Sequence, residues 1–337
     1  MNQEQENWAD FVLSKKEIEG CRHKSEKRWY RFLCVLNLII IIGVIGCMVA
    51  LLPEKIEKFK QDVSERVKEI GITLDKAKDT TKGRESENQD KSKKKAERNK
   101  DQGKDEASLS EEEDDIFNEC LIAIIIFLIL PLVLNFMYQK YRAMSIRITP
   151  KNFPEIYERV ELYAKRLGMK KVPEVYIIQQ NGILNAFSAF IIRKQYIEIF
   201  SDIFEIAYRE HKDLESISFI IAHEMAHIHY KHATFGYNFK MLFSNRIPIL
   251  SSTASRAREY SCDRLAQKLT GNDGIEAMFS LMAGKHLYKM VDKEDYMEYA
   301  KSVKGIFIWV ANLVADHPIM TKRIIALEKG EGSGKLY

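Results

Sequence analysis

Two histidines and a glutamate lie close together in an apolar stretch, in the order His223-Glu224-Met225-Ala226-His227. In a helix, residues four positions apart share a face, so both imidazoles can point at one metal ion. Glu224, next to the first histidine, can then take a proton from a water molecule held on that ion. The alternative is a core helix with two hydrogen-bonded histidines. Two histidines at this spacing with a glutamate between them instead favour a catalytic zinc site.

The residues before the motif predict the helix that it needs. Asp213 is a suitable N-cap, and Leu214, Ile217 and Ile220 then recur at helical spacing. Two further histidines follow the motif. His232 lies nine residues after His223, an awkward spacing for a shared ion, so we interpret His229 and His232 as surface or structural residues.

A catalytic zinc needs a third protein ligand and an open position for water. A second predicted helix contains S-R-A-R-E-Y-S-C-D at residues 255–263, with Glu259 and Asp263 four positions apart on one face. We expect this helix to be capped within residues 251–253 and to end before Gly271. Glu259 can bind the metal while Asp263 accepts a hydrogen bond from the distal N–H of a ligand imidazole. A solvated acidic helix face is the alternative, and the pattern alone does not decide between the two.

Three segments occur in a fixed order: His223–His227, residues 255–263, and D-H-P-I-M-T-K-R-I at residues 316–324. Together they resemble the integral-membrane zinc metallopeptidases of family 48, which are related to HtpX and to the CAAX prenyl proteases. The likeness covers about residues 140–330. The resemblance implies that Glu259 is the third ligand of one Zn²⁺ per chain, with Asp263 supporting the site. Cys262 stands where the family often has alanine.

The resemblance also implies residues that contact a substrate. Asn185-Ala186-Phe187 resembles an N-A-F element of the family. We expect it on or beside an edge strand that can pair with an extended peptide. A plain core strand, with Phe187 in the core, is the alternative.

His317 and Arg323, in the third segment, are implied to donate hydrogen bonds to a developing oxyanion or to the substrate backbone. The alternative is structural. Asp316 and His317 then cap the last helix, Pro318 is its first residue, and Arg323 lies on the surface.

Two segments, residues 31–53 and 116–138, are each about twenty residues long, apolar and almost uncharged, and are predicted to span a membrane. A soluble protein with two buried helices is the alternative. Five Lys or Arg residues lie at positions 22–31 and three at positions 140–147, whereas five acidic residues stand at positions 111–115. This distribution favours both termini in the cytosol and a two-span protein in an inner or plasma membrane.

The region between the predicted spans, residues 54–115, has two parts. In residues 54–74 apolar residues recur every three or four positions, which predicts an amphipathic helix that continues from the first span. The apolar face of this helix could form a coiled coil with a partner or with a second copy of the chain, or it could lie on the membrane surface. Residues 75–115 alternate lysine with acidic residues and contain almost no apolar ones, so they are predicted to be disordered.

Residues 1–30 are expected to form a cytosolic tail, and residues 139–337 the peptidase domain. Its class is α+β, a mainly helical zincin-type (gluzincin) domain with a small β-sheet from strands near 175–178, 187–192 and 196–200. The net charge of +4 over 337 residues does not suggest nucleic-acid binding, and five scattered cysteines form no disulfide framework.

The predicted function is zinc-dependent hydrolysis of peptide bonds in membrane or membrane-proximal proteins, in proteolytic quality control. Glu224 is the expected general base, and His317 is expected to stabilise the oxyanion. A CAAX-type activity is less expected, because residues 233–254 are too polar to add a span. The competing hypothesis is a non-proteolytic zinc-containing membrane adaptor or sensor that binds partners through residues 54–74. Retention of Glu224 argues against it, because a structural zinc needs no general base.

Overall fold

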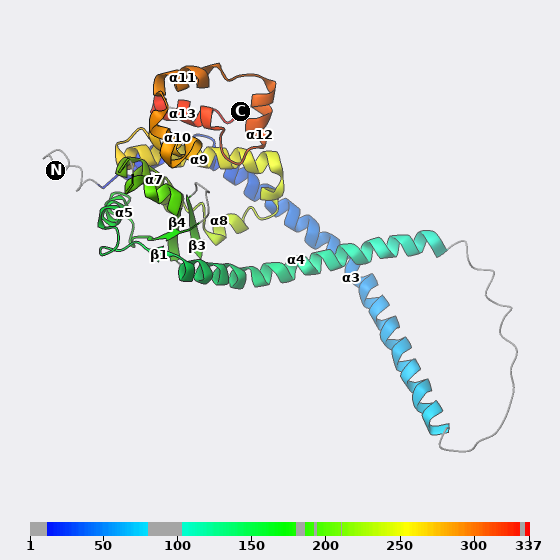
Figure 1. The fold of residues 1–337 in the computed structure, drawn as a ribbon. Helices are drawn as coiled ribbons and strands as arrows, with labels where there is room; N and C mark the ends of the chain where they lie inside the picture. The colour runs from blue at the N-terminus through cyan, green and yellow to red at the C-terminus, as the bar shows by residue number, and fades with distance from the viewer. Residues whose placement is uncertain (1–11, 80–102, 180–185, 192–193, 210, 331–333) are drawn as a thin grey trace. The chain divides into compact units, whose positions relative to one another are not determined.

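The computed structural model describes residues 12–79, 103–179, 186–191, 194–209, 211–330 and 334–337. The chain divides into two compact units, one of Met1–Ile40 with Pro131–Tyr337 and the other of Ile41–Leu130. Figure 1 shows the helices and strands of the first unit, which contains every residue of the predicted zinc site that the structure describes.

Two long helices, α3 and α4, belong partly to each unit, and the remaining elements belong to the first unit. The helices are α2 (Lys15–Gly20), α3 (Glu26–Asp79), α4 (Gly103–Met144), α5 (Pro154–Arg166), α6 (Ser201–Phe204), α7 (Leu214–His229), α8 (Phe235–Phe239), α9 (Pro248–Thr270), α10 (Ile275–Leu287), α11 (Lys293–Ser302), α12 (Ile306–Val314) and α13 (Met320–Lys329). The strands are β1 (Ile146–Arg147), β2 (Glu174–Ile178), β3 (Ala186–Ile191) and β4 (Lys194–Phe200), and the 3-10 helices are η1 (Glu205–Ala207), η2 (Ser244–Arg246) and η3 (Tyr288–Met290).

The strands form one sheet in the order β1-β2-β4-β3. Strands β2 and β4 are parallel, with Val175 opposite Ile197, and the outer pairs are antiparallel. In the described part of the chain, β3 is therefore an edge strand. Ile197 and Ile199 of β4 have no exposed surface, and Tyr196 and Glu198, which point to the other face, are buried too, so this strand is covered on both faces. The predicted α+β class with a small sheet is confirmed.

Helix α7 lies at the centre of the domain and contacts the sheet, α5, α9 and α10 (Figure 1). Ile217, Ile221 and Met225 of α7 and Leu265 of α9 have no exposed surface. Each such side chain contributes about 1.5–3 kcal/mol through burial, so the helix that carries the two histidines is held on all sides.

The predicted cap of α9 is wrong, and so is the start of α13 that the structural alternative for Asp316 and His317 assumed. Helix α9 begins at Pro248 rather than at a cap in residues 251–253, because proline suits the first helical position. The hydroxyl of Thr253 donates instead to the carbonyl oxygen of Ile249, at 2.8 Å. Helix α13 begins at Met320, after Pro318, and Ile319 is its N-cap.

The described part of the predicted N-terminal tail packs against the domain. The amide of Leu13 donates to the carbonyl of Arg166 at 2.8 Å, and the amide of His23 donates to Ser261 Oγ at 2.8 Å. Between them, Ser14 caps α2 in a capping box. Residues 12–30 are thus fixed on α5 and α9 before α3 leaves the domain.

One helix among the described residues, Glu26–Lys58 within α3, is long and apolar enough to cross a membrane. The second predicted span, residues 116–138, forms part of α4 and remains a prediction. Helix α3 continues through residues 54–79, so the predicted helix at 54–74 is present, but nothing described supports a coiled coil. Of the segment predicted to be disordered, residues 75–79 and 103–115 are helical and residues 80–102 lie outside the described residues. Alternating Lys and Glu residues also favour helix through pairs four positions apart.

Candidate metal centre

Helix α7 places His223 and His227 on one face. It begins at the predicted N-cap Asp213, whose side chain accepts hydrogen bonds from the amides of Glu215 and Ser216 at 3.1 and 2.9 Å. Tyr288 also donates to this carboxylate, at 2.9 Å, so the cap is itself held in place. Because the helix is fixed at its start and buried along its length, the two imidazoles have little freedom.

Helix α9 places Glu259 and Asp263 opposite α7. It ends at Gly271, which has the left-handed φ of 72° that a C-cap requires. Arg256, with no exposed surface, donates to the carbonyl oxygens of Leu313 and Ala315 at 2.9 Å each. This arginine ties the segment after α12, which leads to His317, to the same helix as Glu259.

The ligand atoms of His223, His227 and Glu259 converge. The two Nε2 atoms are 3.2 Å apart, and Glu259 Oε2 and Oε1 lie 3.4 and 3.3 Å from Nε2 of His223 and His227. Ligand atoms bound at about 2.0–2.1 Å to a tetrahedral zinc stand about 3.3 Å apart. The two Nε2 atoms and the Glu259 carboxylate are therefore spaced as the ligands of one zinc ion would be.

His223 is supported by a carboxylate and a guanidinium. Its Nδ1 lies 2.9 Å from Asp263 Oδ1, the contact expected for the distal N–H of a ligand imidazole. Arg323 donates to both oxygens of Asp263, at 2.6 and 2.7 Å, and lies 3.5 Å from Glu259 Oε2. All of these side chains are buried.

His227 is supported by a different arrangement, which reaches the start of α3. Its Nδ1 lies 3.2 Å from Nδ1 of His232, and Nε2 of His232 lies 3.1 Å from Glu26 Oε1. If His227 binds metal through Nε2, its Nδ1–H must donate to His232, whose Nε2–H then donates to Glu26. Ser261 and Arg22 also donate to the Glu26 carboxylate.

Charge stabilises the two ligand groups that must hold a cation. Burial opposes ionisation of Glu259, but His223 and His227 hold its pKa well below the usual value. Burial likewise lowers the pKa of His223, but Asp263 and Glu259 outweigh it and raise that pKa to about 9. A divalent cation would replace this proton between the same negative groups. Burial lowers the pKa of His232 to about 3, so His232 is a neutral link.

A second group of possible ligands consists of His227, His232 and Cys262. It fits zinc less well. Burial raises the pKa of Cys262 well above its usual value, whereas a zinc ligand must be a thiolate. In addition, Glu26 already occupies Nε2 of His232, and Cys262 Sγ lies 3.7 Å from Nδ1 of the same ring.

A cavity of about 230 Å³ opens beside the first group. All three ligand residues line it, and Glu224 lines it too. The other lining residues are Ala186, His232, Ala233, Ser255, Arg258 and His317. The structure thus offers space for a water molecule and a peptide group next to both the ligands and Glu224.

Of the residues predicted to contact a substrate, some line this cavity and others do not. Ala186, the first residue of the edge strand β3, lines the cavity, whereas Asn185 lies outside the described residues. Phe187 pairs with Glu198 in the register of β3 and β4. His317 is 66% exposed and its Nε2 lies 3.7 Å from Glu259 Oε1. Arg323 is buried, contrary to the surface alternative, and is not among the residues that line the cavity.

Three residues near the ligands were not predicted: His232, Glu26 and Arg22. Lys231, with a left-handed φ of 64°, turns the chain after α7 so that His232 comes back onto His227. The contact of His232 is therefore with His227, five residues before it, and not with His223. Glu26 lies 206 positions from His232, and no local pattern marks that contact.

Residues 150–245 match the family model described as Peptidase family M48. The matched residues include the H-E-x-x-H helix α7 and end before α9, which carries Glu259. No curated protein matches the chain at a significant level. The match confirms the resemblance that the sequence motifs indicated: residues 150–245 are similar to peptidase family M48, a family of metal-dependent peptidases.

Proposed function

We propose that this protein is a membrane-anchored zinc endopeptidase that cleaves membrane or membrane-proximal proteins. The observation that carries the proposal is the convergence of the two Nε2 atoms and the Glu259 carboxylate, with contacts of 3.2–3.4 Å, in the same cavity as Glu224. A zinc ion held there would supply a Lewis acid that acidifies water and polarises a scissile carbonyl.

The chain's own groups perform the proton transfers. Glu224 accepts a proton from the attacking water and later delivers it to the leaving amine, the role of a general base and then acid. His317, on the exposed rim, donates a hydrogen bond to the oxygen that becomes negative. Arg323 and Asp263 act behind the ligands by fixing the ring of His223.

The edge strand supports binding of an extended peptide. Strand β3 contacts α7, and its first residue lines the cavity. A substrate strand added to its free edge would place its backbone along β3 and toward Glu224. Backbone pairing of this kind recognises many sequences, which suits a protease that removes damaged proteins.

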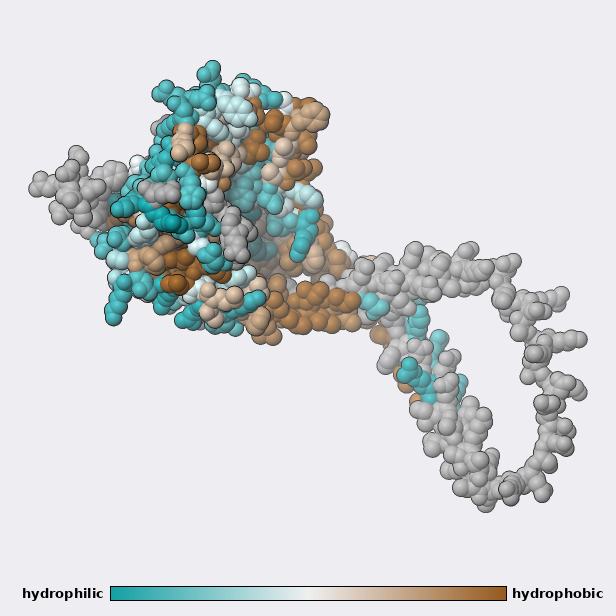
Figure 2. Space-filling model, viewed as in Figure 1, coloured by the Kyte–Doolittle hydropathy of each residue, from teal (hydrophilic) through white to brown (hydrophobic). Residues whose placement is uncertain are grey.

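Membrane anchoring is supported by the surfaces of α3 and α4. Helix α3 exposes Val35, Ile39 and Ile42 at 58–61%, and α4 exposes Leu132 and Phe136 at 66–71%. Figure 2 shows a brown apolar stretch along α4. Apolar surface of this extent on single helices is typical of lipid-facing segments. We place both termini in the cytosol.

The experiment for activity compares Glu224→Gln with a matched control, Glu215→Gln, an exposed glutamate on the same helix. The full chain is purified in detergent and given casein. Glu224→Gln should keep its zinc and lose cleavage by several orders of magnitude, because the proton acceptor is gone. Glu215→Gln should cleave like wild type. Full activity of Glu224→Gln would refute the proposed mechanism, and a wild-type protein with zinc but no cleavage would favour an adaptor.

The experiment for topology uses single cysteines on a background without the native ones. A cysteine at Ser92 should react with an impermeant reagent in intact cells, and one at Gly330 only after permeabilisation. The reverse result would place the peptidase domain on the outer side of the membrane.

A further inference from the structure

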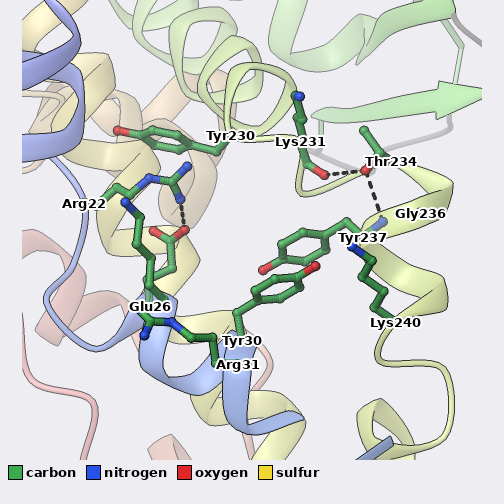
Figure 3. Close-up of a pocket in the computed structure, with 11 residues that line it drawn as sticks. Arg22, Glu26, Tyr30, Arg31, Tyr230, Lys231, Thr234, Gly236, Tyr237 and Lys240 are labelled. Atoms are coloured by element: carbon green, nitrogen blue, oxygen red, sulfur yellow. Dashed lines mark hydrogen bonds and ion pairs between the residues drawn. The ribbon is translucent and has the colours of Figure 1, made fainter. Parts of the chain in front are cut away.

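A second and larger cavity, of about 520 Å³, lies beside the first turns of α3. Its walls are α3 and the segment from Tyr230 to Lys240, which includes α8 (Figure 3). Cavities of about 300–1,000 Å³ are typical of small-molecule sites. Glu26 lines this cavity and also contacts His232, but the cavity shares none of the three predicted zinc ligands.

The charge on the walls is strongly positive. Five cationic residues line the cavity, against one carboxylate, that of Glu26. The cations are Arg22, Lys27, Arg31, Lys231 and Lys240. Glu26 is already engaged by Arg22 and His232, and the pKa of Glu26 is lowered, although burial opposes its ionisation.

Two of the five cations have a partner outside the cavity, since Arg22 and Lys27 both form ion pairs with Glu19. The other three, Arg31, Lys231 and Lys240, are exposed and form no ion pair with any described residue. Three unpaired cations around one space create a positive potential that an anion would relieve.

Aromatic rings give this space a defined shape. Tyr30 of α3 and Tyr237 of α8 stack with centroids 4.3 Å apart and planes 11° from parallel (Figure 3). On the opposite wall the Arg22 guanidinium lies 3.9 Å from the centre of the Tyr230 ring. Thr234 caps α8 by accepting a hydrogen bond from the amide of Tyr237, which fixes the second wall. Guanidinium, ammonium and hydroxyl donors on rigid walls suit the oxygens of a phosphate.

The cavity also lies next to the apolar surface of the chain. Exposed apolar residues of α3 begin at Phe32, and Phe235 and Phe239 are exposed on α8. A helix rises 1.5 Å per residue, so Glu26 lies about 9 Å before Phe32 along α3. The head-group layer of a bilayer is about 5–8 Å thick. If the hydrocarbon begins at Phe32, the cations of the cavity lie at the depth of the lipid phosphates.

We propose that this cavity binds the phosphate of an anionic glycerophospholipid, with the acyl chains along α3 and the exposed phenylalanines of α8. The inference rests on the membrane anchoring in the proposed function but not on peptidase activity. Basic clusters and pockets that directly precede a membrane span are a recognised form of anionic-lipid site. Free inorganic phosphate offers the same chemistry, and the experiment separates the two sources.

The experiment measures lipid binding to the full chain in a neutral detergent by native mass spectrometry. Short-chain phosphatidylglycerol, phosphatidylcholine of equal chain length and inorganic phosphate are titrated separately. The wild type should bind phosphatidylglycerol at least about tenfold more tightly than the other two. The triple variant R31Q/K231Q/K240Q should bind it about a hundredfold more weakly, because each cation near a phosphate contributes about fivefold.

The matched control, K170Q/K171Q/K304Q, removes the same charge from exposed lysines that do not line the cavity and should bind like wild type. Lys240→Glu, a change at one exposed residue, provides a second test and should weaken binding by at least about fivefold. Equal binding of the two lipids, or of wild type and the triple variant, would overturn the proposal. Inorganic phosphate bound as tightly as phosphatidylglycerol would overturn the lipid as the ligand.

Discussion

The two histidines of the H-E-x-x-H helix are held in different ways. His223 contacts a carboxylate directly, Asp263, which is itself paired with Arg323. His227 contacts a neutral imidazole, His232, and only through it the carboxylate of Glu26. The supports of His223 come from α9 and α13, whereas the support of His227 reaches the first turn of α3.

The candidate metal centre therefore contacts the N-terminal segment as well as the peptidase helices. Glu26 begins the helix that is long and apolar enough to cross a membrane. The helix that we propose as the membrane anchor would therefore also orient one of the proposed ligands. We infer that the His223 side dominates metal affinity, because a direct carboxylate raises the basicity of an imidazole more than a neutral relay does.

The largest effect is expected for loss of the shared ligand. Glu259→Ala should lose zinc almost completely, beyond the tenfold to hundredfold loss that removal of a supporting partner causes. Zinc content after dialysis against a weak chelator measures this. Glu276→Ala, an exposed acid on α10, is the control and should retain zinc. Wild-type zinc content in Glu259→Ala would show that another residue completes the ligand set.

The support of His223 is tested next. Asp263→Ala should weaken zinc affinity by about 10- to 100-fold, because His223 loses its hydrogen-bond acceptor and the buried Arg323 keeps only its longer contact with Glu259. Competition with a chromophoric chelator gives the affinity. Since burial of Arg323 alone could destabilise the fold, the double variant Asp263→Asn with Arg323→Gln should fold and still bind zinc more weakly than wild type. Unchanged affinity in both variants would remove Asp263 from the site.

Removal of the residues that support His227 should reduce zinc affinity less than removal of Asp263. Glu26→Gln should weaken zinc affinity by about tenfold or less, and His232→Gln should have a similar effect, because each interrupts the same relay. In the double variant the two losses should not add. Glu19→Gln, an exposed acid of the same segment that also pairs with Arg22, should change nothing. Additive losses would mean that the two residues act separately.

Glu198 differs from Asp263 and Glu26, the acids that support the two histidines, because one of its buried carboxylate oxygens has no hydrogen-bond partner among the described residues. Glu198 on β4 is 1% exposed, and its Oε2 has no hydrogen-bond partner among the described residues. Burial raises its pKa from the usual 4.5 to about 7. The folded state thus binds more protons at Glu198 than the unfolded state between these values, so the contribution of Glu198 to stability is most favourable below pH 4.5 and becomes less favourable as the pH rises to about 7.

Glu198→Gln should remove the loss of folding stability that ionisation of Glu198 causes at high pH, a loss of about 1–3 kcal/mol. Its melting temperature in detergent should exceed that of wild type by a few degrees at pH 8 and should converge with it toward pH 5. Zinc content should stay the same, because Glu198 does not line the cavity beside the zinc ligands. A variant that melts with the same pH dependence as wild type would contradict a neutral Glu198.

Local periodicity explains what could be predicted from the sequence. His223 and His227, and likewise Glu259 and Asp263, are four residues apart, so a helix alone brings each pair onto one face. The strands of the sheet were predicted by their run of β-branched and aromatic residues, and β3 and β4 match those predictions within about two residues.

The missed residues depend on tertiary structure. His232 reaches His227 only because Lys231 adopts a left-handed conformation, which no general rule assigns to lysine. Glu26 had no predicted role, since its contact with His232 forms only when residues 206 positions apart are brought together by folding. Arg323 was assigned to the substrate by the family resemblance, whereas its place behind His223 depends on its contact with Asp263 of α9.

X-ray absorption at the zinc edge of the purified full chain tests the central assignment most directly. If His223, His227 and Glu259 hold the metal, the spectrum shows nitrogen and oxygen ligands at about 2.0–2.1 Å and no sulfur. The competing group of His227, His232 and Cys262 would add a zinc–sulfur distance of about 2.3 Å. We expect zinc ligands without sulfur, and the same absorption spectrum for wild type and Cys262→Ser. A sulfur ligand that disappears in Cys262→Ser would contradict this assignment.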